Sequence, residues 1–122
     1  MYKLSDAELD ILLVLWECAA PISPTELLVK MNENGHSWSI STLQTLLARV
    51  LSKEAVVASC KKRFRYYAPA CTKEHFLAAN TGHLLRQLST YSPISLPKAL
   101  VEAELLTAQD LEEAKALLSE RT

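Results

Sequence analysis

The sequence predicts a mainly α-helical protein with one small β-hairpin, and two observations support this. Only 2 glycines and 5 prolines interrupt the 122 residues, so we expect helices joined by short connections rather than a glycine-rich barrel or phosphate loop. Hydrophobic residues make up 49% of the chain and recur at helical spacing, except between residues 55 and 69, where β-favouring residues dominate. The composition excludes a disordered or collagen-like chain.

Capping boxes begin the first two predicted helices. Ser5 and Glu8 have the spacing at which a hydroxyl and a carboxylate satisfy each other's backbone amides, and leucines follow at helical intervals. Ser23 and Glu26 repeat the pattern, with Pro24 at the first helical position, where a missing N–H costs nothing. The two helices are therefore expected to begin at residues 6 and 24.

The third predicted helix has two contrasting faces. It follows a turn at Gly35, and we expect it to begin near Ser41, with Gln44 as its capping partner. Its leucines and valines fall on one side, and the opposite side carries Ser41, Thr42, Gln44, Thr45, Ala48, Arg49 and Ser52. A solvated helix face usually holds Glu–Lys pairs four residues apart, and this one has none. Small polar side chains beside an arginine suit contact with base edges in a DNA major groove.

Two β-favouring runs, residues 55–60 and 65–68, predict a hairpin closed by Pro69. Its tip, Lys61-Lys62-Arg63, is basic. Three helices followed by a hairpin is the order of a winged helix-turn-helix. In that fold the third helix enters the major groove, and the hairpin, or wing, lies on the DNA backbone.

The net charge of −1 conceals a basic middle segment. Residues 38–70 hold six Lys or Arg and one acidic residue, whereas residues 1–37 hold two basic and six acidic residues and residues 71–122 hold five basic and seven acidic. Such a distribution is typical of a protein that presents one face to an anion. A charged surface that only keeps the protein in solution is the alternative.

Residues 71–122 are predicted to form three short amphipathic helices, which begin after Thr72, at Pro97 and after Thr107. Helices this few and short bury their apolar faces poorly without a partner. We therefore divide the chain into a winged-helix domain, residues 1–70, and a helical dimerisation module, residues 71–122. The residues expected at the dimer interface are Phe76, Leu84, Leu88, Ile94, Leu100, Val101, Leu105, Leu111 and Leu118.

The residues expected to contact DNA lie on the third helix and the wing. Those on or beside the helix are expected to touch base edges and nearby phosphates: Ser39, Ser41, Thr42, Gln44, Thr45, Arg49 and Lys53. Those of the wing are expected to neutralise the backbone: Lys61, Lys62, Arg63 and Arg65. Because Tyr66 and Tyr67 point to opposite faces of a strand, one of them is expected to pack inward.

Other functional classes find little support. No Ser/His/Asp or Cys/His grouping has a supporting motif, so we expect no enzyme. Cys71 and His75 form only a weak metal-ligand pair, and we expect no metal and no cofactor. Cys60 and Cys71 are not expected to face each other across the hairpin, so free thiols are predicted. Without an apolar signal segment or a membrane-length apolar run, a cytoplasmic protein with no membrane insertion is expected.

The sequence resembles the penicillinase-repressor family (BlaI/MecI/CopY) over nearly its whole length. The specific block is Trp38-Ser39-x-x-Thr42-x-x-Thr45-Leu46-Leu47-x-Arg49-x-x-x-Lys53, and it is accompanied by Leu4-Ser5-x-Ala7-Glu8, Leu15-Trp16, Arg63, Tyr67-x-Pro69 and Leu111-Glu112-Glu113. The resemblance implies a homodimeric repressor that binds a dyad-symmetric operator in double-stranded DNA, often before a resistance operon. It also implies a membrane-bound sensor protease that inactivates the repressor by cutting its dimerisation region.

The chain departs from the family pattern at four places. Glu54 replaces the glycine that usually follows the lysine at the end of the recognition helix, and Lys62 replaces a glycine common at the wing tip. Ala99-Leu100 stands where the best-known repressors have the Asn-Phe pair at which they are cut, so a protease acting here needs a different preference. The paired C-terminal cysteines of copper-responsive members are absent, which excludes copper sensing by that device.

Two functions are open at this point. The first is a homodimeric operator-binding repressor, which the concentrated basic segment favours. The second is a winged-helix dimer that acts as a protein-interaction module without sequence-specific DNA binding, which Glu54 and the near-zero net charge favour slightly.

Overall fold

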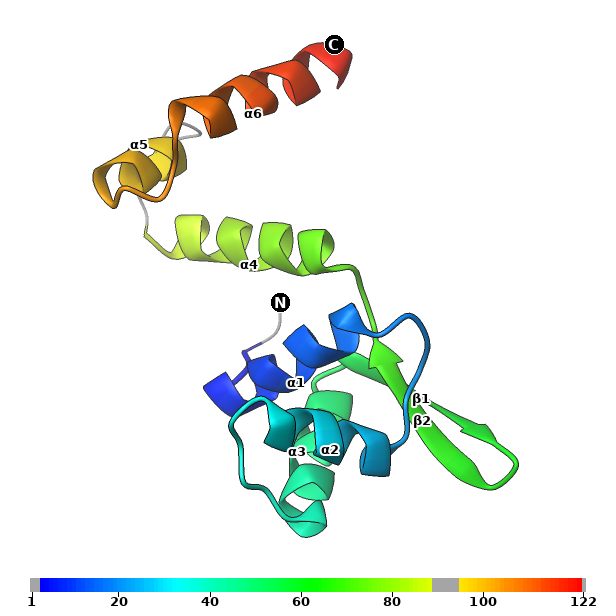
Figure 1. The fold of residues 1–122 in the computed structure, drawn as a ribbon. Coiled ribbons are helices and arrows are strands. Elements are labelled where there is room, and N and C mark those ends of the chain that lie inside the picture. The colour runs from blue at the N-terminus through cyan, green and yellow to red at the C-terminus, as the bar shows by residue number, and fades with distance from the viewer. Residues whose placement is uncertain (1–2, 89–94, 122) are drawn as a thin grey trace. The chain divides into compact units, whose positions relative to one another are not determined.

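The computed structural model describes residues 3–88 and 95–121, and the chain divides into two compact units, Met1–Asn80 and Thr81–Thr122. In the first unit three helices precede a hairpin: α1 (Asp6–Glu17), α2 (Pro24–Glu33), α3 (Ile40–Ser52), β1 (Val56–Lys61) and β2 (Phe64–Pro69) (Figure 1). Three more helices follow: α4 (Lys73–Gln87), α5 (Ser95–Glu102) and α6 (Ala108–Arg121). The predicted fold, mainly α with a winged helix-turn-helix, is confirmed.

The predicted caps account for the first two helix starts. The Ser5 hydroxyl accepts a hydrogen bond from the Glu8 amide at 3.2 Å, and the Glu8 carboxylate accepts one from the Ser5 amide at 3.4 Å. At α2 the Ser23 hydroxyl accepts from the Glu26 amide at 3.3 Å, and Pro24 is the first helical residue. The Glu26 carboxylate accepts from the Ser23 hydroxyl at 3.4 Å instead of the Ser23 amide, so only half of the predicted capping box forms. The sequence therefore marks both boundaries correctly.

The third helix begins at Ile40, one residue before the expected start, and its cap differs from the prediction. Ser39 is the N-cap, and its hydroxyl accepts a hydrogen bond from the Thr42 amide at 3.2 Å. Ser41 and Gln44 therefore lie inside the helix and do not form the expected capping box. Ser39, Ser41 and Thr42 all carry hydroxyls that can cap a helix, and the turn before α3 places Ser39 at the N-cap position.

That turn is held by side chains on both sides of it. Gly35 has a positive φ of 99°, a backbone conformation that glycine adopts without strain. The Asn32 amide accepts from the Trp38 amide at 2.9 Å and donates to the Trp38 carbonyl at 3.2 Å. The His36 ring stacks on Trp38 with its centroid 4.2 Å away, and its Nε2 lies 3.1 Å from a carboxylate oxygen of Asp10. These contacts fix the direction in which the chain enters α3.

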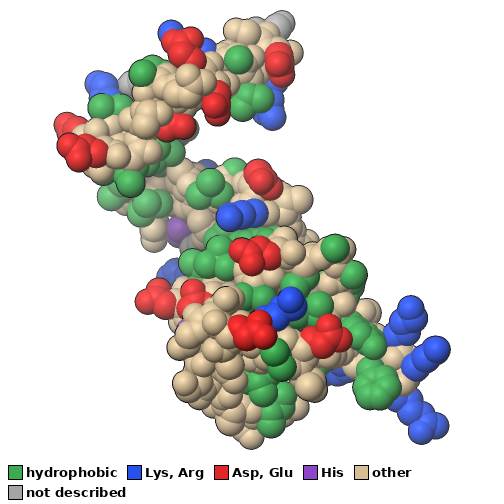
Figure 2. Space-filling view, viewed as in Figure 1, with side chains coloured by type: hydrophobic (Ala, Val, Ile, Leu, Met, Phe, Trp, Pro, Cys, Tyr) green, Lys and Arg blue, Asp and Glu red, His purple; other side chains and the backbone are tan. Residues whose placement is uncertain are grey.

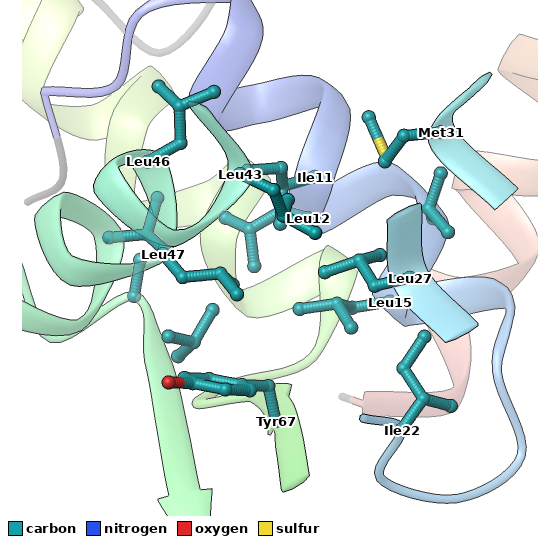
Figure 3. Close-up of a cluster of buried hydrophobic side chains, with 14 residues drawn as sticks. Ile11, Leu12, Leu15, Ile22, Leu27, Met31, Leu43, Leu46, Leu47 and Tyr67 are labelled. Carbon is teal, nitrogen blue, oxygen red and sulfur yellow. The ribbon is translucent and has the colours of Figure 1, made fainter. Parts of the chain in front are cut away.

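The hydrophobic core lies between α1, α2, α3 and the base of the hairpin (Figure 3). Ile11, Leu27 and Leu43, one from each of the three helices, are completely buried. Each fully buried aliphatic side chain contributes about 1.5–3 kcal/mol to folding. The core therefore fixes the rotation of α3 about its axis, and with it the face that α3 turns to solvent.

The hairpin is anchored at its base and has a strained tip. Its register runs from Val56 opposite Pro69 to Lys61 opposite Phe64, which leaves Lys62 and Arg63 as a two-residue turn. Both turn residues have positive φ (53° and 74°), the geometry of a type I′ turn, which favours Asn-Gly. At the base, the backbone of Ile22 exchanges two hydrogen bonds with that of Tyr67, at 3.0 and 2.8 Å.

Two of the later helices, α4 and α6, also begin at the expected hydroxyls. The Thr72 hydroxyl accepts from the His75 amide at 3.1 Å, and Thr107 and Asp110 exchange side-chain-to-backbone bonds at 2.9 and 3.1 Å. Pro97 is the third residue of α5 rather than its first. None of the helices built by residues 3–88 and 95–121 is both long and apolar enough to cross a membrane.

Candidate DNA-binding surface

The outward face of α3 is as polar as the sequence predicts. Leu43, Leu46, Leu47 and Val50 are buried, and Ser41, Thr42, Gln44, Thr45, Ala48, Arg49 and Ser52 are exposed. The Thr45 hydroxyl donates to the Ser41 carbonyl at 3.0 Å. The side chains of Gln44 and Arg49 make no hydrogen bond or ion pair with any residue that the structure describes, so their donors are free. Glutamine is suited to bidentate contact with adenine, and arginine to bidentate contact with guanine.

The wing carries the second cluster of predicted residues. Lys61, Lys62, Arg63 and Arg65 are all exposed, and Figure 2 shows Lys and Arg side chains gathered at the end of the hairpin. The Arg65 guanidinium lies over the Tyr67 ring, 5.6 Å from its centroid. Tyr67 is buried and Tyr66 is half-buried, so the predicted inward packing of one of the two tyrosines is confirmed, and Tyr67 is that residue.

A groove of about 480 Å³ joins these two clusters. Ile40 and Gln44 of α3 line one side of it, and residues 63–66 of the wing line the other. The start of α2, residues 23–26, also lines it. The fold therefore brings Gln44 to the same groove as Arg63 and Arg65. Gln44 offers a side-chain amide on one wall, and Arg63 and Arg65 offer guanidinium groups on the other. Among the described residues of the lining, Glu26 is the one acidic residue. Two cations against one carboxylate suit an anionic backbone running between the walls.

Comparisons with known proteins agree with this geometry. The sequence profile of the family described as "Penicillinase repressor" matches residues 4–120. The chain belongs to the penicillinase-repressor family. A curated relative, the penicillinase repressor of Bacillus licheniformis, is 24% identical over 118 residues, which are 97% of this chain and 91% of that protein. The predicted family is thus confirmed.

The family fold is also seen in a solved structure. The solution structure of the DNA-binding domain of the repressor BlaI matches with a TM-score of 0.51 and 30% sequence identity, and the match covers 60% of this chain and 90% of that one. This likeness confirms that residues of this chain form a winged-helix domain.

Lys53, which the sequence predicts to contact DNA, is paired with groups of its own chain. Its ammonium lies 2.7 and 2.9 Å from the two carboxylate oxygens of Glu8 and 2.7 Å from the Lys3 carbonyl. Glu8 is only 3% exposed, and its hydrogen bonds with Lys53 outweigh burial and hold the pKa of its carboxyl below the usual 4.5. Because an ammonium has three N–H groups, these contacts account for all of them. No local pattern links residues 8 and 53, so the sequence gives no sign of this pair.

Two of the four departures from the family pattern fall where the backbone is left-handed. Glu54, which replaces the usual glycine of the penicillinase repressors, has φ 62°, and Lys62, which replaces the wing-tip glycine, has φ 53°. The chain thus makes the turns for which the family uses glycine and accepts the strain of a side chain at each.

The residues expected at the dimer interface fall into three groups. Ile94 lies outside the described residues. Phe76 packs edge-to-face on Trp16 of the same chain, with ring centroids 5.4 Å apart, and the Trp16 indole donates to the Cys71 carbonyl at 2.9 Å. The remaining ones are half-buried or exposed apolar side chains: Leu84, Leu88, Leu100, Val101, Leu105, Leu111 and Leu118.

The cysteines and histidines form no evident second site. Cys18, Cys60 and Cys71 are all free thiols. Among the described residues, no group of three or more His, Cys, Asp or Glu side chains converges as metal ligands would. Ala99 and Leu100, the counterparts of the family's cleavage pair, lie within α5.

Proposed function

We propose that this chain is a homodimeric transcriptional repressor that binds a dyad-symmetric operator in double-stranded DNA. One observation carries the proposal: Gln44, on the exposed polar face of α3, lines the same groove as Arg63 and Arg65 of the basic wing. Membership of the penicillinase-repressor family and likeness to the DNA-binding domain of BlaI support it.

In this account α3 lies in the major groove and the wing lies on the adjacent backbone. Arg49 and Gln44 contact base edges, with Ser41, Thr42 and Thr45 around them. Lys61, Lys62, Arg63 and Arg65 neutralise phosphates, which contributes affinity and salt dependence rather than sequence preference. The Ser39 hydroxyl is occupied in capping α3, and the Lys53 ammonium in pairing with Glu8, so both residues act by holding the helix in place.

Dimerisation is proposed to occur through residues 71–122. The helices α4, α5 and α6 expose leucines and a valine that a second chain would cover. Pairing of two chains places two copies of α3 about one DNA turn (~34 Å), or a multiple of it, apart on one face of the duplex. Because the two half-sites then bind together, separating the chains releases DNA without altering α3.

The setting of this function is part of the proposal. The protein acts in the cytoplasm and has no enzymatic activity of its own. A membrane-bound sensor protease inactivates it by cutting the dimerisation region. Since Ala99 and Leu100 lie within α5, cleavage at that place requires the helix to open first.

A footprint tests the proposal against the rival function. The full-length protein is added to a DNA fragment from directly upstream of its own gene, and protection from DNase is mapped on both strands. The repressor account expects one protected segment with two related half-sites. A protein-interaction module would leave the fragment evenly cut at protein concentrations that saturate a repressor.

A further inference from the structure

Phe64 is an exposed aromatic residue at the end of a strongly basic wing. Its side chain is 65% exposed, and it lies directly opposite Lys61 in the hairpin, beside the turn residues Lys62 and Arg63. It also borders a largely apolar hollow of about 550 Å³, lined by Ala20, Pro21, Ser59, Lys61, Lys62, Phe64 and Tyr66. An apolar patch with a charged rim is typical of an interaction surface rather than of a single stray side chain.

The charges around this patch indicate what covers it. Four cations, at positions 61, 62, 63 and 65, surround Phe64 in sequence, and the exposed end of the hairpin carries no acidic residue. A polyanion is therefore the complementary partner. Phe64 also lines the groove between α3 and the wing, so a duplex read by α3 passes directly beside it.

The geometry of a duplex then gives the position of Phe64. A single phosphodiester backbone separates the major groove from the neighbouring minor groove. If that backbone runs in the groove between Gln44 on one wall and Arg63 and Arg65 on the other, α3 occupies the major groove. The end of the wing then lies across the backbone, over the minor groove.

We propose that Phe64 enters this minor groove and packs against deoxyribose and base edges, while the cations beside it hold the flanking phosphates. The inference rests on the proposed function, and it adds an apolar contact outside the major groove. Apolar side chains in the minor groove favour base steps that open easily, such as pyrimidine–purine steps. The wing would thus recognise the shape of the DNA that flanks each half-site.

Affinity measurements with three variants of the full-length protein test the inference. The probe is a duplex from upstream of the protein's own gene, titrated at several salt concentrations. We expect Phe64→Ala to weaken binding about tenfold at every salt concentration with an unchanged salt slope, because it removes apolar contact and no charge. Lys62→Ala is expected to lower the slope by about one. Val57→Ala, which trims an apolar side chain 52% exposed on β1, is the matched control and should change affinity less than twofold.

Hydroxyl-radical footprinting locates the contact. Wild type should protect deoxyribose in the minor groove beside each half-site, and Phe64→Ala should lose that protection while keeping the protection of the half-sites. Binding by Phe64→Ala within twofold of wild type, or a tenfold loss with the minor-groove protection intact, would overturn the inference. If wild type itself fails to distinguish the upstream duplex from a scrambled one, the proposed function is wrong, and the inference, which depends on it, is wrong as well. Thermal melting of Phe64→Ala checks that the exposed residue leaves the fold unchanged.

Discussion

The ammonium of Lys53 lies 2.7 Å from one carboxylate oxygen of Glu8, joining the end of α3 to the first turn of α1. Glu8 is buried, and it also completes the cap of α1 by accepting from the Ser5 amide. One carboxylate thus stabilises the start of the first helix and the end of the third. This pair makes the placement of α3 depend on a contact that bridges 45 residues of sequence.

Removing the ammonium is expected to destabilise the protein. Lys53→Met leaves the Glu8 carboxylate buried without its partner, and because Lys53 is 37% exposed, water offsets part of the loss, so we expect about 2 kcal/mol. Urea unfolding measures the change. The double variant Glu8→Gln with Lys53→Met should recover much of the loss, since no buried charge remains. A Lys53→Met protein as stable as wild type would show that the pair contributes nothing.

The same pair predicts loss of stability in acid. Folding lowers the pKa of the Glu8 carboxyl below 4.5, chiefly through its hydrogen bonds with Lys53, so the folded state binds the proton less readily than the unfolded state. The resulting stabilisation is fully present above about pH 4.5 and disappears as the pH falls through the folded pKa. Unfolding free energies from pH 7 down to pH 3 should therefore fall more steeply for wild type than for Glu8→Gln. Parallel curves would contradict the assignment.

Glu54→Gly is expected to stabilise the protein. Glu54 has φ 62°, where a side chain is strained, and replacement by glycine relieves about 1 kcal/mol of that strain. The greater conformational freedom of glycine in the unfolded chain offsets part of this gain. Glu54→Gln is the control, because it removes the charge and keeps the strain. A rise in the thermal midpoint for Gly but not for Gln supports the backbone explanation. Equal rises in both variants would assign the effect to charge.

Dimerisation is expected to depend on the exposed leucines of the C-terminal helices. Leu118 of α6 is 66% exposed, and its replacement by Gln removes apolar surface twice in a symmetric dimer, so we expect dimer affinity to fall at least tenfold. Ala116→Gln, on the same helix but turned away from Leu118, is the matched control. Sedimentation equilibrium should give twice the 13.6 kDa of one chain for wild type and the control. A monomeric wild type at micromolar concentration would refute the dimer.

Local signals in the sequence predict much of this fold. The hydroxyls of Ser5 and Ser23 mark helix starts because capping is a contact over three residues. The buried side of α3 follows from its period, and the basic hairpin follows from its β-favouring residues. The predicted α3 cap is wrong because a local pattern cannot choose between Ser39 and Ser41, whereas the contacts of Asn32 with Trp38 do.

Long-range contacts explain what the sequence does not predict about the site. From the sequence Lys53 is one more cation of the basic segment and is expected to contact DNA, and only the structure shows its ion pair with Glu8. From the sequence Phe76 is expected at the dimer interface, and only the structure shows its contact with Trp16 of the same chain. In both cases the partners are far apart in sequence, and only the packing of separate helices brings them together.

Fluorescence anisotropy shows whether α3 recognises a DNA sequence. Labelled DNA from upstream of the protein's own gene and a scrambled duplex of equal composition are titrated with wild type, Arg49→Ala and Lys30→Ala over a salt series. Lys30 is the control because it is an exposed cation outside the proposed DNA-binding surface. The hollow that it lines includes no residue of α3 or of the wing. We predict that wild type and Lys30→Ala bind the upstream duplex far more tightly than the scrambled one, with two chains per site, and that Arg49→Ala loses about tenfold or more of that preference. Equal, weak binding to both duplexes that vanishes at physiological salt would contradict the account and leave the basic wing as a charged patch.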